Sequence, residues 1–218
     1  GISFVWSTQV YQSLNPTATI FLRLVVATIF FTAILFAFRL NEKVKKEHLG
    51  LFALAALFEP FLYFIFEGYG LKNTSPIIGS AIVAMIPLVT PFAARVFLKE
   101  HLSPMNIVGL IVSFIGVIIM LINKNLEFTA SPKGVLLLTG CVLVAVGYSI
   151  ALIRLTKLYK PLTITWVQNI IGMLYFIPLV IIMEHFQPSN FGNVKDYIVP
   201  LVCLGVFCSA ISYSLWAF

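Results

Sequence analysis

Long apolar segments, separated by short polar connections, constrain the fold of this chain more than any other feature of its sequence. A run of about 20 apolar residues is long enough to cross the hydrocarbon core of a bilayer as an α-helix. The first apolar run is too short to span, and we expect the chain to be a fragment clipped inside its first helix and at the end of its last. The pattern predicts eight helices, over residues 1–13, 17–38, 49–70, 75–97, 104–122, 134–155, 162–183 and 198–218.

Composition excludes a water-soluble globule, because the chain carries too few charges to coat one. Only 10% of its 218 residues are charged, 60% are hydrophobic, and the mean hydropathy is +1.02. Soluble domains carry about 25% charged residues. The sequence therefore predicts an all-α, polytopic membrane helix bundle surrounded by lipid. The three cysteines lie in apolar runs without a CxxC pair, which indicates packing residues and not a disulfide framework or a zinc site.

The net charge of +6 is explained by membrane topology and not by nucleic-acid binding. Loops that face the cytoplasm carry an excess of Lys and Arg. If the connection after the helix 17–38 is inside, the outer connections hold Lys72, Lys124, Lys133 and Lys195. The inner connections then hold Arg39, Lys43, Lys45, Lys46, Arg95, Lys99, Arg154, Lys157 and Lys160. We therefore place this second set on the cytoplasmic side, with the bacterial cytoplasmic (inner) membrane as the expected location.

Four prolines lie inside the predicted helices. A proline in a helix interior removes a backbone hydrogen bond and clashes with the preceding turn, so it bends or breaks the helix. We expect such kinks at Pro60, Pro87, Pro91 and Pro178.

Two segments of the chain align with each other and indicate an internal repeat. "SLNPTATIFLR", ending at Arg23, matches "LYKPLTITWVQ", ending at Gln168, so that Pro16 falls on Pro161. Further along, Tyr63 falls on Tyr213. Because five helices separate the two copies, the second copy must be inverted in the membrane. Inverted repeats are typical of secondary transporters, in which the two halves give inward-open and outward-open states around a central site.

Ionisable residues inside apolar segments are candidates for function, because a charge in hydrocarbon is costly unless something offsets it. Arg23 lies about 9 Å from the outer end of its helix, where it either acts in a solute path or extends to the outer headgroups. Glu59 lies about 15 Å deep, near the midplane, where a carboxylate must be protonated, paired or facing water. Its alternative reading is a structural ion pair or a protonated core acid.

Glu67, near the outer end of the helix 49–70, is either an acid solvated at the interface or the partner of Arg23. Glu59, Tyr63 and Glu67 follow one another at four-residue intervals and form one polar stripe on this helix. Glu67 matches the depth of Arg23 better than Glu59 does. We therefore expect an Arg23–Glu67 pair at the outer mouth, made directly or through water.

Four more residues are candidates for the lining of a solute path. Gln168 and Asn169 add uncharged hydrogen-bonding groups, which serve either the path or contacts between helices. Tyr213 is the repeat counterpart of Tyr63. Trp6 either lines the path or anchors its helix at the membrane interface.

Several enzyme signatures are absent from the sequence. There is no GxxxxGK[ST] motif, which a P-loop ATPase would need, and no HExxH motif for a zinc protease. The only aspartate, Asp196, lies in a connection, and the three histidines are scattered over loops. We expect no enzyme activity, no catalytic residue, no metal site and no cofactor. No soluble segment interleaves basic and aromatic residues, so we expect no nucleic-acid partner.

The segment 63–121 resembles the EamA domain of the drug/metabolite transporter superfamily. The resemblance rests on "GLKNTSP", "IPLVTP", "LKEHLS" and "NIVGLIVSFIGVIIM", and upstream on "FVW" and "NPTATIFLR". It implies ten helices in two inverted five-helix repeats around a central cavity, in proteins that move metabolites such as amino acids, often outward. On this basis residues 1–122 form a first repeat and residues 134–218 an incomplete second one, so that eight helices of ten are present.

The sequence thus predicts a secondary transporter for small organic, amino-acid-like or related solutes that works by alternating access. Helices one to four and six to eight should line the path, with the protein a monomer or a homodimer. A membrane channel or a non-transporting membrane subunit is the alternative. An ATP-driven permease subunit would need a longer cytoplasmic coupling segment, since the inner connections here have about ten residues at most. A membrane enzyme would need clustered His, Asp or Cys residues.

Overall fold

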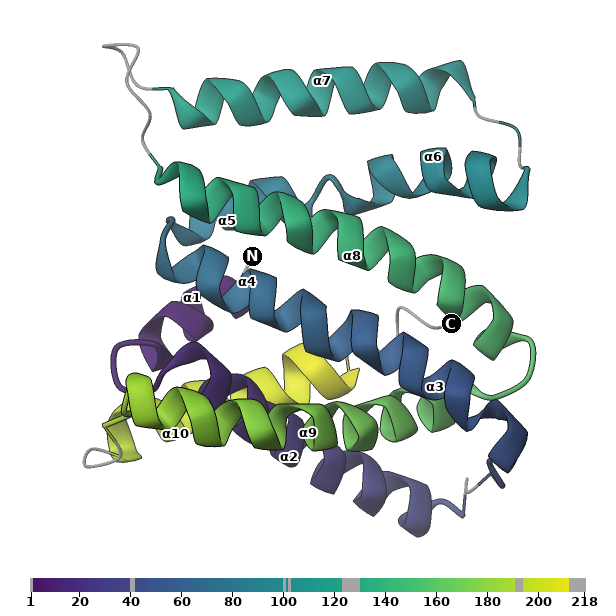
Figure 1. The fold of residues 1–218 in the computed structure, drawn as a ribbon, viewed down its shortest axis with the longest axis vertical. Helices are drawn as coiled ribbons and strands as arrows, with labels where there is room; N and C mark the ends of the chain where they lie inside the picture. Colours follow the sequence, from purple (N-terminus) through teal and green to yellow (C-terminus); the bar gives the residue numbers. More distant parts are fainter. Residues whose placement is uncertain are drawn as a thin grey trace.

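The computed structural model describes residues 2–39, 42–99, 101, 103–122, 130–190 and 194–211. Its helices lie side by side across the molecule, with α7 at one edge (Figure 1). The first half contains α1 (Ile2–Val10), α2 (Pro16–Ala37), η1 (Lys46–His48), α3 (Leu49–Ala56), η2 (Leu57–Leu62), α4 (Tyr63–Lys72), α5 (Pro76–Val83), α6 (Ile86–Leu98) and α7 (Pro104–Leu121). The second half contains α8 (Pro132–Thr156), α9 (Pro161–Phe186), α10 (Val194–Cys203) and η3 (Leu204–Ile211).

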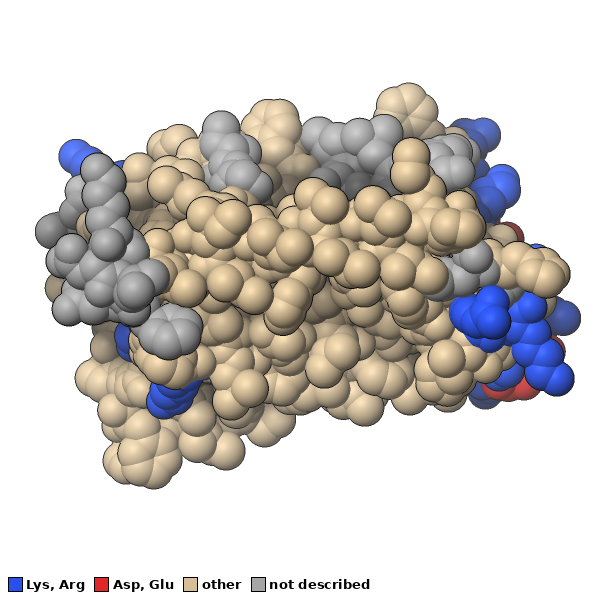
Figure 2. Space-filling model, turned by 90° about the horizontal axis from the view of Figure 1, so that it is seen from above, with Lys and Arg blue, Asp and Glu red and all other residues tan. Residues whose placement is uncertain are grey.

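Each of the eight predicted helices overlaps one or more of these elements, residues 212–218 of the last lying outside the described part of the chain, and the all-helical bundle is confirmed. Within the described residues, six helical stretches are long and apolar enough to cross a membrane: Pro16–Ala37, Lys46–Lys72, Pro76–Phe97, Pro104–Leu121, Pro132–Thr156 and Pro161–Phe186. Figure 2 shows Lys and Arg at the two ends of the molecule, with a broad band of other residues between them. The chain is therefore an integral, multi-pass membrane protein.

Most of the long helices begin with a proline preceded by a polar residue. Pro lacks the N–H that would be unsatisfied in the first turn, and a Ser or Asn side chain before it accepts a hydrogen bond from a free backbone N–H. Asn15 Oδ1 accepts from the Ala18 N–H at 2.8 Å, and Ser75 Oγ accepts from the Ile78 N–H at 3.3 Å. These local signals place the helix starts within one or two residues of their predicted positions.

Two of the four predicted kink prolines lie at interruptions of a helix. At Pro60 the span 49–72 widens into a π-helical turn, and Glu59 leaves helical geometry with φ −141° and ψ 118°. Before Pro87 the fourth span breaks at residues 84–85, between α5 and α6. By contrast, α6 continues through Pro91 and α9 continues through Pro178. Pro200, inside α10, is a further interior proline that the prediction omitted.

The α2 and α9 helices run antiparallel and make the contact around which the two halves are arranged. Near its middle, Thr28 Oγ1 donates to Met173 Sδ at 3.4 Å, and these residues differ by 145 positions, the offset of the repeat alignment. At one end Asn15 Nδ2 donates to the Gln187 carbonyl at 2.9 Å, and at the other the Lys160 N–H donates to Glu42 Oε2 at 3.0 Å. Adding the offset of 145 to residue 15 gives Lys160, and adding it to residue 42 gives Gln187. Residues at repeat-related positions thus meet at both ends of the pair.

Several further helix contacts also join the first half of the chain to the second. The α2 helix packs against η3, and α9 packs against α3 and η2. Likewise α1 packs against α10, and its counterpart α8 packs against α3, η2 and α4. Each half therefore completes its packing with the third helix of the other half.

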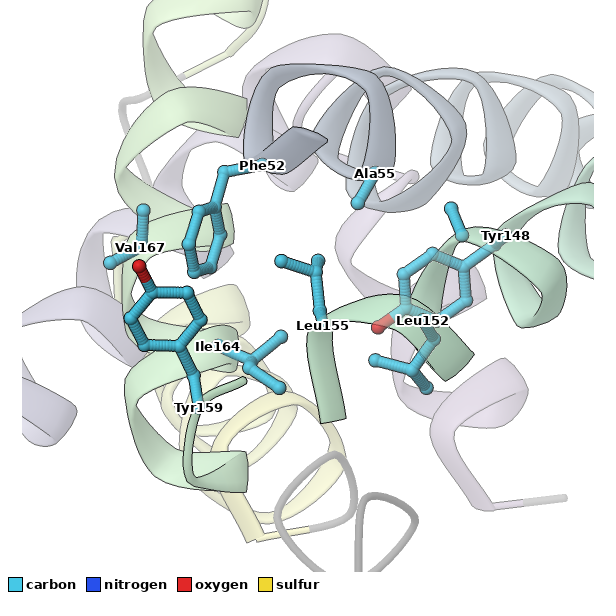
Figure 3. Packing of buried hydrophobic residues seen from close by; sticks show 9 residues of the cluster. Phe52, Ala55, Tyr148, Leu152, Leu155, Tyr159, Ile164 and Val167 are labelled. Atoms are coloured by element: carbon cyan, nitrogen blue, oxygen red, sulfur yellow. The ribbon is translucent and has the colours of Figure 1, made fainter. Parts of the chain in front are cut away.

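The core at the more basic end lies where α3, α8 and α9 meet. Phe52, Leu155 and Ile164 point toward one another from these three helices (Figure 3). Tyr159, in the turn between α8 and α9, packs its ring 5.1 Å from that of Phe52. Its hydroxyl lies 2.6 Å from His48 Nδ1 and accepts from the Lys45 N–H at 3.1 Å. This cluster joins α3 to α8 and α9 at the more basic end.

We predict that Gly172→Ala destabilises the bundle, because the added methyl group would overlap the Pro60 ring. Overpacking of this kind costs about 1–3 kcal/mol, which lowers Tm by roughly 2–12 °C in a protein of this size. The measurement is thermal unfolding of the purified protein in detergent. Gly116→Ala is the matched control, because its methyl group would meet no described atom within 4 Å. Equal Tm values for the two variants would contradict the packing of α9 against the Pro60 kink.

Candidate functional site

A cavity of about 340 Å³ lies between the halves, near the kink of the third span. Among the described residues its wall comes from α1, α2, η2, α4, α5, α6, α8 and η3. No described residue of α7 or of α9 lines this cavity. The polar and ionisable residues of this wall are Ser3, Arg23, Glu59, Tyr63, Glu67, Tyr148, Ser149 and Cys208.

Arg23 and Glu67 form a buried ion pair on the wall of this cavity. Arg23 Nη1 lies 3.8 Å from Glu67 Oε2, and the two side chains are only 7% and 8% exposed. The guanidinium carbon also lies 4.3 Å from the centre of the Phe64 ring, a cation–π contact. The predicted pair is confirmed. The two alternatives, an Arg23 that extends to the headgroups and a Glu67 solvated at the interface, are wrong because both side chains are enclosed by protein.

Glu59 lies at the kink and faces two spaces at once. It contributes to the wall of the main cavity and to a recess of about 10 Å³, enough for one water molecule. The α9 helix contributes Thr165, Gln168 and Asn169 to this recess, and α8 contributes Tyr148. The π-helical turn at Pro60 turns the backbone of Glu59 out of the helix and so places this side chain between α8 and α9.

Gln168 and Asn169 are buried beside Glu59 with unused hydrogen-bonding capacity. They are 4% and 3% exposed, and Tyr148 Oη donates to Gln168 Oε1 at 3.2 Å. Within the described part of the chain, the side-chain nitrogens of Gln168 and Asn169 have no hydrogen-bond partner. Buried N–H donors left without an acceptor are costly, so these two amides favour an acceptor in the recess.

The structure brings most of the predicted residues together. Arg23, Glu59, Tyr63 and Glu67 share the main cavity, and Gln168 and Asn169 lie in the adjoining recess. Trp6 is not among the described residues that line either space, and packs beside Val10, Leu14 and Leu201 instead. The prediction for Tyr213 lies outside the described residues.

The prediction omitted two neighbouring residues of α8, Tyr148 and Ser149. Both line the cavity, and Tyr148 also reaches the recess. The sequence did show a tyrosine beside a serine near the middle of the otherwise apolar segment 134–155. These two residues could not be assigned to a cavity without knowing which side of α8 faces the Pro60 kink.

A helix bundle with an ion pair and a second carboxylate on the wall of an internal cavity fits a membrane protein of the transporter class, and comparisons with known proteins agree. The model of the EamA-like transporter family matches residues 1–122, and the chain belongs to this family. A protein of known crystal structure superposes with a TM-score of 0.70 at 18% identity, over 99% of this chain and 75% of that one, which shows the same fold.

Two relatives carry transporter names. An uncharacterized transporter of Archaeoglobus fulgidus is 23% identical, over 99% of this chain and 74% of the relative. The uncharacterized transporter YcxC of Bacillus subtilis is 27% identical, over 97% of this chain and 70% of the relative. Neither name specifies a substrate.

We predict that Arg23→Leu lowers the Tm more than the double variant Arg23→Leu/Glu67→Leu does. Removing one partner of a buried pair costs about 3–5 kcal/mol, because the other charge stays buried alone, whereas two apolar residues are often tolerated. Thermal unfolding in detergent measures both. The exposed Lys45–Glu47 pair is the control, and Lys45→Leu should leave the Tm unchanged. A double variant that is no more stable than Arg23→Leu would contradict the pairing.

Proposed function

We propose that this protein is a secondary transporter that moves small organic, amino-acid-like or related solutes across the bacterial cytoplasmic membrane by alternating access. The observation that carries the proposal is a cavity between the helices whose described lining includes one arginine and two carboxylates. Its volume of about 340 Å³ lies at the lower end of the range for small-molecule sites. The transporter family of the chain supports the same class of function.

The cavity residues suggest a role for each group. Glu59 would accept the ammonium group of a solute, or a proton, near the midplane. Arg23 would hold a carboxylate closer to the outer mouth, and Tyr63 would donate a hydrogen bond to the solute. Gln168 and Asn169 would support Glu59 through an acceptor, such as a water molecule, in the recess.

The two ends of the α2–α9 pair supply contacts that would open in turn. At the outer end, Glu184 accepts from Asn15 Nδ2 at 2.7 Å and from Ser189 Oγ at 2.6 Å. At the inner end, Lys160 contacts Glu42, and the Tyr159 hydroxyl contacts Lys45 and His48. Because repeat-related halves are interchangeable, breaking one set while the other holds would expose the cavity to one side at a time. The more basic end would face the cytoplasm.

We predict that Glu59→Gln lowers solute exchange at least about tenfold, since a charge-assisted contact contributes about 1.5–3 kcal/mol. The measurement is counterflow of radiolabelled amino acids in proteoliposomes. Glu47→Gln makes the same change at an exposed position of η1, outside the cavity, and should retain wild-type exchange. Wild-type counterflow in Glu59→Gln would contradict the role of this residue. Flux that does not saturate and shows no counterflow would indicate the alternative, a channel.

A further inference from the structure

We infer that Glu67 occupies, in the solute-free protein, an anion subsite on Arg23 that a carboxylate of the solute takes over during transport. This inference rests on the proposed transport function and deepens it. It assigns Glu67 the role of an internal competitor that determines how well carboxylate-bearing solutes bind. The subsite itself consists of the Arg23 guanidinium beside the Phe64 ring.

The position of the pair allows this exchange. Arg23 and Glu67 both line the 340 Å³ cavity, so a solute inside it reaches the guanidinium without passing another layer of protein. The pair lies between α2 and α4, and Phe64 on α4 contacts the guanidinium at 4.3 Å. A ring beside a guanidinium limits its orientations and so prepares it for a planar anion.

The length of the pair also favours an exchange. The Nη1–Oε2 distance is 3.8 Å, whereas a charge-assisted N–H···O bond is about 2.7–2.9 Å long. A guanidinium binds a carboxylate best through two parallel hydrogen bonds. A mobile solute carboxylate can adopt that geometry, whereas the Glu67 carboxylate is held on a helix whose backbone is packed against α2 and α8.

Charge balance explains why a competitor is needed. Arg23 is buried, and a buried cation without a counter-ion is strongly disfavoured. Glu67 supplies the counter-ion when no solute is present, and the solute carboxylate supplies it when the cavity is filled. The guanidinium is therefore neutralised in both states. Binding a solute carboxylate then leaves Glu67 without its counter-ion, and this loss weakens solute binding.

The competitor model predicts a definite order of affinities. Glu67→Gln removes the competing charge and should strengthen carboxylate binding most. Glu67→Asp keeps the charge but withdraws it by one bond, about 1.5 Å, so it should strengthen binding by a smaller factor. A general electrostatic effect would leave Glu67→Asp equal to the wild type, which separates the two explanations.

The test compares L-phenylalanine with L-phenylalaninamide, which lacks the carboxylate, in proteoliposome counterflow. We expect the half-saturation concentration of L-phenylalanine to fall about tenfold in Glu67→Gln and about threefold in Glu67→Asp. That of the amide should not fall in either variant. Glu59→Asp is the matched control, since it shortens the other cavity carboxylate and should give no gain for L-phenylalanine. Calorimetric binding of both solutes to the monodisperse variants in detergent gives a second readout where a variant exchanges slowly.

The outcomes separate the inference from the function on which it rests. If the wild type exchanges solutes but neither Glu67 variant binds L-phenylalanine more tightly, the inference is wrong and the transport function stands. An equal gain for the amide would also overturn it, because the amide has no carboxylate for Arg23. If the wild-type protein exchanges neither these two solutes nor any other carboxylate–amide pair of a solute panel, both the inference and the proposed function fail.

Discussion

The antiparallel contact between α2 and α9 is the constraint on which the rest of the structure depends. In lipid, a helix gains no hydrophobic stabilisation from meeting another helix, so the pair must be held by close packing and hydrogen bonds. Thr28 meets its repeat counterpart Met173 near the middle, and equivalent contacts join both ends. This arrangement places Arg23 and Gln168 at matching depths from opposite ends, and the cavity and its recess lie beside them.

The polar groups of the bundle are tolerated because protein, and not lipid, surrounds them. Arg23 and Glu67 neutralise each other, and both side chains are buried within the bundle. Glu59 depends on a different feature, because at the π-helical turn beside Pro60 its backbone leaves helical geometry, and Glu59 shares a recess with Gln168 and Asn169 of α9. The helix irregularity and the polar site are thus one feature, consistent with the rule that irregular backbone at membrane depth lines a cavity.

The helix positions and the Arg23–Glu67 pair could be predicted from residue patterns. Which face of each helix meets the cavity could not, because it depends on how each helix is rotated about its own axis in the bundle. Apolar segments and proline positions gave the helix starts and the breaks near Pro60 and Pro87. Equal depth along antiparallel spans gave the Arg23–Glu67 pair, since rise per residue is constant. Tyr148 was missed because α8 is apolar on nearly all sides. Its sequence therefore has no periodic pattern that marks the side facing Glu59. The packing of Trp6 beside Val10 and Leu14 depends on the angle at which α1 meets α10, which the sequence does not specify.

The central claim is that the cavity between the inverted halves is reached from each side of the membrane in turn. The most direct measurement is modification of Ser149→Cys, a cavity position on α8, in a variant whose native Cys141, Cys203 and Cys208 are replaced by serine. A membrane-impermeant thiol reagent is applied to either side of sealed vesicles. The account predicts labelling from both sides and protection by a transported solute. Labelling from neither side, or from one side alone under every condition, would contradict it.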